Sequence, residues 1–196
     1  MKDSYITVAK EHIFKQVIDR SVFIGHVKKT ESEEEAREFI KEIKNKYSDA
    51  THNCSAYVQG MGGEHEFADD NGEPGGSAGK PILGVLRSKG LTNVTLVVTR
   101  YFGGKKLGVR GLIDAYGSTA RLCLEEAGIK EEIVKEVIRI KCSYKDINRI
   151  LYIIEKGQGE VVEKDYAQEI LLAISIRLRD KDTLKDMLAG FAEILF

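Results

Sequence analysis

Acidic and basic side chains gather in two glycine-rich segments of this 196-residue sequence. The first segment, residues 69–81, is acidic, and the second, residues 99–112, is basic. Glycine is costly in conformational entropy, so a dense run of it marks turns or backbone that another group approaches closely. Because paired acids and bases occur both in binding clefts and in structural ion-pair networks, we expect the candidate site where the two segments face each other.

Two sets of residues are candidates for this site. The anion-binding candidates belong to the basic segment and are Arg100, Tyr101, Gly103, Gly104, Lys105, Lys106 and Arg110. The cleft-lining candidates are His52, Asp69, Asp70, Glu73, Ser77, Lys80 and Thr99. Basic and aromatic side chains on a glycine loop that precedes a helix N-terminus suit the phosphates and unstacked bases of RNA. The alternative is that Arg100 pairs with Asp69, Asp70 or Glu73, so that the two segments lock together.

Familiar catalytic motifs do not match. The P-loop spacing fails because Pro74 occupies its first glycine position, and the dinucleotide fingerprint fails because Gly103 and Gly104 are adjacent. Residues 75–79 have the spacing of a serine-hydrolase nucleophile elbow, but a turn precedes them and all four histidines come before Ser77. No histidine, cysteine or aspartate cluster has the spacing of a zinc or calcium site. The sequence therefore identifies no catalytic residue, and we expect neither a metal nor a cofactor.

The bulk composition indicates a soluble protein of the reducing cytoplasm. The formal charge is −1, which gives no global attraction to nucleic acid or membrane, and no DNA sequence specificity is expected. The three cysteines are widely spaced and odd in number, which argues against a disulfide framework. No apolar run approaches the roughly 20 residues that cross a bilayer, and the N-terminus has no signal-peptide pattern.

The first part of the chain predicts the element order β-β-α-β-β-α-β-α. Residues 6–9 alternate only weakly, and a capping-box spacing at Thr30–Glu33 begins the first helix. The predicted strands are 12–18, 21–27, 53–59, 64–67 and 94–99, and the predicted helices are 30–47, 81–89 and 112–127. The strand at 94–99 is rich in β-branched residues and is expected to be the most buried.

The second part predicts the order β-α-β-β-α-β, which is ferredoxin-like with one solvated sheet face. The predicted strands are 138–142, 160–166, 169–179 and 192–196, and the predicted helices are 147–154 and 184–191. The charged run Lys130-Glu131-Glu132 interrupts the apolar pattern, so the domain boundary is expected between Gly128 and Lys135. This gives an α+β chain of two domains, 1–131 and 132–196.

The motifs of the two glycine-rich segments resemble the YigZ/IMPACT family. The matching residues are 69–74 with 78–81, 97–104 with Leu107, Gly108, Gly111 and Leu112, and also His52 and Cys54. Ser77 and Arg110 depart from the pattern, since the family usually has threonine and a small residue there. The resemblance implies an N-terminal Impact domain similar to domain IV of elongation factor G, with the ribosomal-protein-domain-2-like β-α-β arrangement. It also implies a ferredoxin-like C-terminal domain similar to domain V of that factor.

The same resemblance implies a link to translation. Eukaryotic relatives regulate translation under stress by competing for the activator of the kinase that acts on the initiation factor, and they use an additional RWD domain. We therefore expect a non-enzymatic binding or regulatory protein, whose partner is RNA, the ribosome or a translation-regulatory protein. The alternative is an enzyme acting on a small anionic, phosphorylated substrate, with Asp69, Asp70 or Glu73 as acid or base. A third possibility is protein docking on the C-terminal sheet, through Arg139, Lys141, Arg177 and Arg179.

Overall fold

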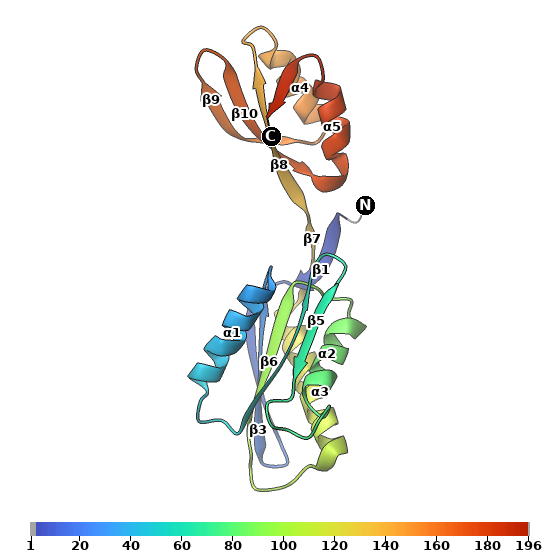
Figure 1. The fold of residues 1–196 in the computed structure, drawn as a ribbon. Coiled ribbons are helices and arrows are strands. Elements are labelled where there is room, and N and C mark those ends of the chain that lie inside the picture. The colour runs from blue at the N-terminus through green and yellow to red at the C-terminus, as the bar shows by residue number, and fades with distance from the viewer. Residues whose placement is uncertain (1–2, 196) are drawn as a thin grey trace. The chain divides into compact units, whose positions relative to one another are not determined.

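The computed structural model describes residues 3–195 (Figure 1). Met1 and Lys2, assigned above to the first domain, and Phe196, assigned to the last strand, lie outside the described residues. The described chain divides into two compact units, one of residues 5–132 and one of residues 3–4 together with 133–195. Each unit has its own sheet and its own apolar core, which confirms the two-part α+β fold.

The sheet of the first unit has five antiparallel strands in the order β2-β3-β6-β4-β5. Their bounds are β2 His12–Ile18, β3 Ser21–Lys29, β4 His52–Gln59, β5 His65–Asp69 and β6 Val94–Tyr101. The central strand β6 is buried along all of its length except Tyr101, as its β-branched sequence predicts. The two edge strands, β2 and β5, are more exposed.

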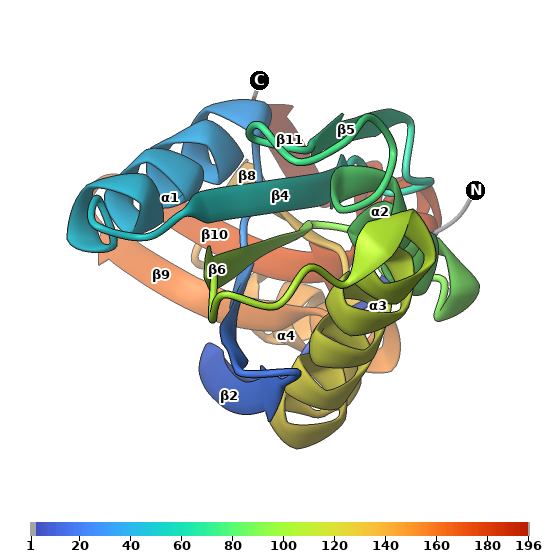
Figure 2. The same cartoon turned by 90° about the horizontal axis from the view of Figure 1, so that it is seen from below.

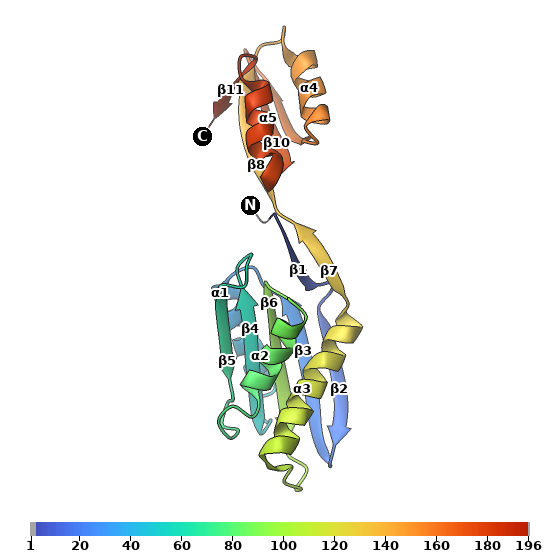
Figure 3. The same cartoon turned by 90° about the vertical axis from the view of Figure 1, so that its right-hand side faces the viewer.

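Helices cover both faces of this sheet (Figures 2 and 3). The helix α1, Glu33–Lys46, packs on one face through Phe39, Ile40 and Ile43, which contact Tyr57 and Val97. The helices α2, Gly79–Ser88, and α3, Gly108–Ala127, pack on the other face. Because side chains alternate along a strand, β4 and β6 contribute to both apolar layers.

A separate two-stranded sheet is formed by β1, Ser4–Val8, and β7, Ile129–Ile133. This corrects the sequence interpretation, which found only weak alternation at 6–9 and treated the charged run at 130–132 as a break. The charges are compatible with a strand because Lys130 and Glu132 pair with each other and Glu131 is exposed. The carboxylate of Glu132 accepts from Lys29 Nζ at 2.6 Å and from Tyr5 Oη at 3.3 Å. Hydrogen bonds from Lys130 and Lys29 lower the pKa of Glu132 to about 2.

The second unit has the ferredoxin-like topology that the sequence predicts. The strands are β8 Lys135–Cys142, β9 Glu160–Tyr166, β10 Ile170–Arg177 and β11 Ala192–Leu195, and the helices are α4 Ile147–Lys156 and α5 Lys181–Leu188. They form an antiparallel sheet in the order β11-β8-β10-β9. Two predicted bounds were wrong: β10 ends at Arg177, before a short 3₁₀ turn at Leu178–Asp180, and α5 ends at Leu188, before Gly190 with its φ of +87°.

The domain limits 1–131 and 132–196 remain a proposal about independent folding, and a core substitution tests it. Ile174 is fully buried in β10, so Ile174→Ala should lower the free energy of unfolding of residues 133–195 by about 2–5 kcal/mol. Hydrogen exchange should then accelerate in those amides and stay unchanged in residues 5–132. Val162→Ala, at a site 54% exposed, is the matched control. Faster exchange throughout both units would contradict independent folding.

Candidate functional site

A buried ion pair joins the two glycine-rich segments. Arg100 Nη1 donates to Glu73 Oε1 at 2.7 Å, and the two side chains are only 6% and 4% exposed. Tyr116 Oη of α3 donates to the same carboxylate oxygen at 2.8 Å. The guanidinium carbon of Arg100 lies 5.4 Å from the ring centroids of both Phe23 and Phe102. Arg100 therefore pairs with Glu73, and not with Asp69 or Asp70.

The carboxylate of Asp70 organises the acidic segment. It accepts hydrogen bonds from the backbone amides of Gly76, Ala78 and Gly79 at 2.6, 3.0 and 2.8 Å. Burial alone would raise the pKa of Asp70, but the three amide bonds outweigh burial and hold this pKa below its usual value. Ser77 is buried and donates through Oγ to the Pro74 carbonyl at 2.6 Å. The side chains of Asp70 and Ser77 therefore stabilise the backbone conformation of the acidic segment and of the start of α2.

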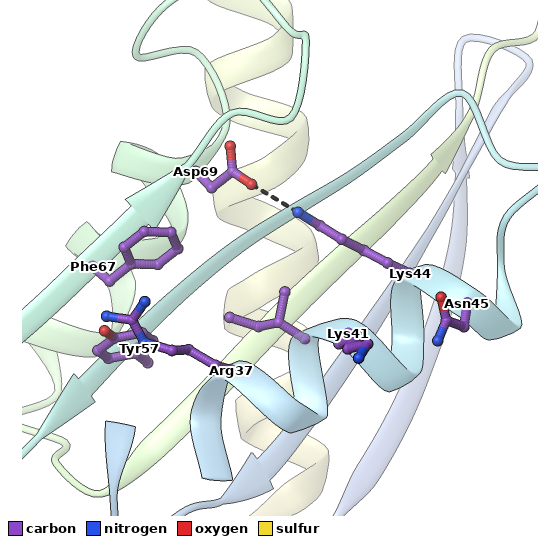
Figure 4. Close-up of a pocket in the computed structure, with 8 residues that line it drawn as sticks. Arg37, Lys41, Lys44, Asn45, Tyr57, Phe67 and Asp69 are labelled. Carbon is purple, nitrogen blue, oxygen red and sulfur yellow. Dashed lines mark hydrogen bonds and ion pairs between the residues drawn. The ribbon is translucent and has the colours of Figure 1, made fainter. Parts of the chain in front are cut away.

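Three predicted residues lie on the opposite face of the sheet, beside α1. Asp69 Oδ2 accepts from Lys44 Nζ at 2.9 Å (Figure 4). Thr99 Oγ1 donates to Asn53 Oδ1 at 2.7 Å, and Tyr101 Oη donates to Asp49 Oδ1 at 2.8 Å. The cause is the alternation of side chains along β6, which directs Thr99 and Tyr101 to the face opposite Arg100.

A cleft of about 450 Å³ lies between the acidic segment, the end of β6 and the start of α3. It brings together the predicted residues His52, Glu73, Arg100 and Lys106. The full lining is Thr51, His52, Glu73, Pro74, Arg100, Phe102, Lys106, Leu107, Gly108, Val109 and Leu112. Lys80 and Arg110 are exposed outside this lining. The site set drawn from the sequence omitted the apolar residues at the start of α3, although they belong to the basic segment itself.

His52 presents one ring nitrogen toward the acid of the buried pair. Its Nδ1 lies 2.9 Å from the carbonyl oxygen of Asn71, and a carbonyl only accepts, so this contact assigns the proton to Nδ1. Its Nε2 lies 3.9 Å from Glu73 Oε1. Arg100 Nε is buried without a hydrogen-bond partner among the described residues. The cleft thus places an oriented imidazole beside a buried ion pair.

The basic segment keeps its shape through Gly103 and presents its charges to solvent. A Cβ added at Gly103 would lie 1.9 Å from the Arg20 carbonyl oxygen, so only glycine fits there. Gly104 adopts a positive φ of +86°. Lys105 pairs with Asp19 at 2.7 Å, and both side chains are exposed. Lys106 has no ion pair among residues 3–195.

Arg110 lies one helical turn from its own partner. Its Nε contacts Asp114 Oδ2 at 3.2 Å, and its side chain is 87% exposed. Exposed ion pairs of this kind contribute only about 0–1 kcal/mol, as does the pair of Lys105 with Asp19. Lys105 and Arg110 can therefore exchange these partners for an external anion at little cost.

The basic residues of the C-terminal sheet, considered above for docking, are largely paired. Lys141 Nζ lies 3.0 Å from Glu169 and 3.2 Å from Glu193. Arg177 and Arg179 both contact the carboxylate of Asp3, and Arg179 belongs to the 3₁₀ turn and not to a strand. Among the described residues, Arg139 is the only one of the four without an ion pair within 4.0 Å. This face therefore offers little unpaired charge.

Three further features concern metal binding, thiol chemistry and membrane insertion. Within residues 3–195, no group of three or more histidine, cysteine or acidic side chains is arranged to hold a metal ion. Cys54, Cys123 and Cys142 are buried free thiols, and burial raises the pKa of Cys54 and of Cys123 to about 12. No helix in the described part of the chain is long and apolar enough to cross a membrane.

The fold and the cleft define an α+β protein with an ion-paired glycine-rich site in its first unit and a ferredoxin-like second unit. The sequence pattern of the Impact N-terminal domain matches residues 19–124, more than half of the chain. The chain is 39% identical to the IMPACT family member YvyE of Bacillus subtilis, over 87% of this chain and 78% of that protein. It is 30% identical to the IMPACT family member YigZ of Escherichia coli, over 95% and 90%. The chain belongs to the IMPACT family.

A solved structure agrees with this assignment at the level of the fold. A crystal structure described as that of an hypothetical protein is 28% identical and aligns over 100% of this chain and 98% of that one, with a TM-score of 0.69. The two-domain translational regulator Yih1 is 25% identical over 63% of this chain and 47% of that one. Its TM-score is 0.37.

Removing one charge of the buried pair should destabilise the first unit strongly. Glu73→Gln leaves the Arg100 guanidinium buried without a counter-charge, and the expected loss is about 3–5 kcal/mol in the free energy of unfolding. The double variant Glu73→Gln/Arg100→Met removes both charges and keeps an acceptor for Tyr116, so it should lose less than Glu73→Gln alone. Urea unfolding measures both. Losses that simply add in the double variant would show that the two charges do not depend on each other.

Proposed function

We propose that this chain is a non-enzymatic binding protein linked to translation, which contacts RNA or a ribosome-associated partner through the exposed part of the basic segment. The observation that carries the proposal is the grouping of Lys105, Lys106 and Arg110 with Phe102 around the N-terminus of α3. The Phe102 side chain is 45% exposed. The first turn of α3 contains no acidic residue to compete for an anion.

In this proposal the basic side chains contact phosphates, and the ring of Phe102 stacks on an unpaired base. Stacking of a base on an aromatic side chain contributes about 1–3 kcal/mol and tolerates any sequence. Arg100 does not contact RNA here, because it is buried against Glu73. It acts as a positioning residue instead, since its guanidinium lies over the Phe102 ring.

The wider setting of the proposal follows from the family. The resemblance to translation factors and regulators favours a role in the cytoplasm, with the ribosome or a translation-regulatory protein as the larger partner. Three buried free thiols are compatible with that reducing compartment.

Charge reversal in the exposed part of the segment tests RNA contact. Lys105→Glu/Lys106→Glu should weaken co-sedimentation with ribosomes and binding of a single-stranded RNA oligonucleotide. The slope of log affinity against log salt concentration should become shallower by about 1–2, because two phosphate contacts are lost. Lys10→Glu/Lys15→Glu makes the same charge change at two other exposed sites and should leave both measurements unchanged. Equal binding by the two double variants would contradict the proposal.

A second candidate function is an enzyme acting on a small phosphorylated substrate in the cleft. It is favoured by the His52 ring, whose Nδ1 contact with Asn71 leaves Nε2 as the proton acceptor. Lys106, which is exposed and also lines the cleft, would then contact the anionic group of the substrate.

A thermal-shift screen with anionic metabolites addresses this candidate. A true ligand should raise the melting temperature of the wild type and of His65→Ala, whose side chain is 63% exposed. The effect should be lost in His52→Ala, together with any turnover. A screen with neither stabilisation nor turnover would count against enzymatic activity and leave the RNA proposal unaffected.

A further inference from the structure

A second concavity lies on the α1 face of the sheet, opposite the face that bears the cleft (Figure 4). It has a volume of about 340 Å³. Its lining residues are Arg37, Ile40, Lys41, Lys44 and Asn45 of α1, Tyr57 of β4, and Phe67 and Asp69 of β5. The proposed RNA contact uses none of them.

The charge of this concavity favours an anionic partner. Arg37, Lys41 and Lys44 follow one another at helical spacing and therefore share one face of α1. Arg37 contacts Glu33 at 3.1 Å and Lys44 contacts Asp69 at 2.9 Å, whereas Lys41 has no ion pair among residues 3–195. Asp69 is the single acidic residue of the lining, so the cations outnumber it.

The floor of the concavity offers an aromatic surface. The rings of Tyr57 and Phe67 stack with centroids 5.1 Å apart and an interplanar angle of 16°. Tyr57 is buried, but Phe67 remains 38% exposed beside the three cations. Phe67 can therefore pack against an apolar side chain of an incoming partner.

The edge of the sheet beside this surface is open. β5 is the last strand in the order β2-β3-β6-β4-β5, so only β4 pairs with it. In an antiparallel edge strand, alternate residues direct their N–H and C=O groups away from the sheet. An extended peptide can use such groups by adding one more strand.

We propose that this surface binds an extended acidic segment of a partner protein, which adds a strand to the free edge of β5. Side chains on one face of a strand recur about every 6.8 Å, and residues 37 and 41 are separated by about 6 Å along the helix axis. Acidic residues at alternate positions of the added strand therefore match the spacing of Arg37 and Lys41. RNA shares the negative charge, but its phosphates only accept hydrogen bonds and cannot pair with the C=O groups of the strand edge, so the geometry points to a peptide.

A fluorescein-labelled octapeptide of alternating glutamate and valine tests the charge match by anisotropy. Wild type should bind it, and Lys41→Glu should weaken binding about fivefold or more, because a favourable surface contact becomes repulsive. Lys15→Glu makes the same change on β2, the opposite edge of this sheet, and should bind like wild type. Unchanged binding by Lys41→Glu, or equal binding of an alternating lysine–valine octapeptide, would overturn the proposal. Thermal melts establish that both variants are folded.

Amide hydrogen exchange tests the added strand itself. The glutamate–valine peptide should slow exchange within residues 65–69 of the full chain and leave β2 unchanged. Protection confined to β2, or no protection at β5 at saturating peptide, would overturn strand addition. If Lys41→Glu weakens binding of an RNA oligonucleotide but not of the peptide, the surface is a nucleic-acid site and the proposal fails. None of these outcomes depends on Lys105 or Lys106, so this proposal and the RNA proposal can fail separately.

Discussion

The buried contact between Arg100 and Glu73 is the constraint on which the candidate site depends. A charge removed from water is tolerated only when its partner and hydrogen bonds are in place. Here the acidic segment supplies the carboxylate, β6 supplies the guanidinium, and α3 supplies the hydroxyl of Tyr116. Three parts of the chain that are distant in sequence must therefore reach their final positions together. The cleft lies directly beside this buried contact, and Glu73 and Arg100 are part of its lining.

The sheet separates two kinds of surface. Side-chain alternation along β6 sends Arg100 toward α3 and sends Thr99 and Tyr101 toward α1. One face consequently carries the cleft, with exposed cations on a loop beside it. The other carries cations on a helix, next to an exposed aromatic ring and an unpaired strand edge. The two proposed partners would therefore bind on opposite faces of one sheet and would not compete directly.

The sequence predicts the ferredoxin-like unit well because its signals are local. The strict alternation of residues 170–178 and the helical stripe at 147–154 each specify one element, and the loops are short. The strand β7 was missed because the charge of Glu132 is compensated by Lys29, which lies far away in sequence. For the same reason, the sequence could not show which of the acids Asp69, Asp70 and Glu73 pairs with Arg100. The side chain of Asp69 lies on the α1 face of the sheet, away from Arg100, and backbone amides bind the carboxylate of Asp70. Neither fact can be inferred without the folded structure.

The close approach of Gly103 to the Arg20 carbonyl separates the parts of the basic segment that can vary from the part that cannot. Every single-nucleotide missense change of a glycine codon introduces a side chain, and each such side chain begins with the Cβ for which there is no room. A lysine codon, in contrast, can mutate to arginine or glutamine with the backbone unaffected. Single mutations can therefore change the basic side chains of this loop in small steps. Any substitution at Gly103, in contrast, forces the backbone of the loop to move.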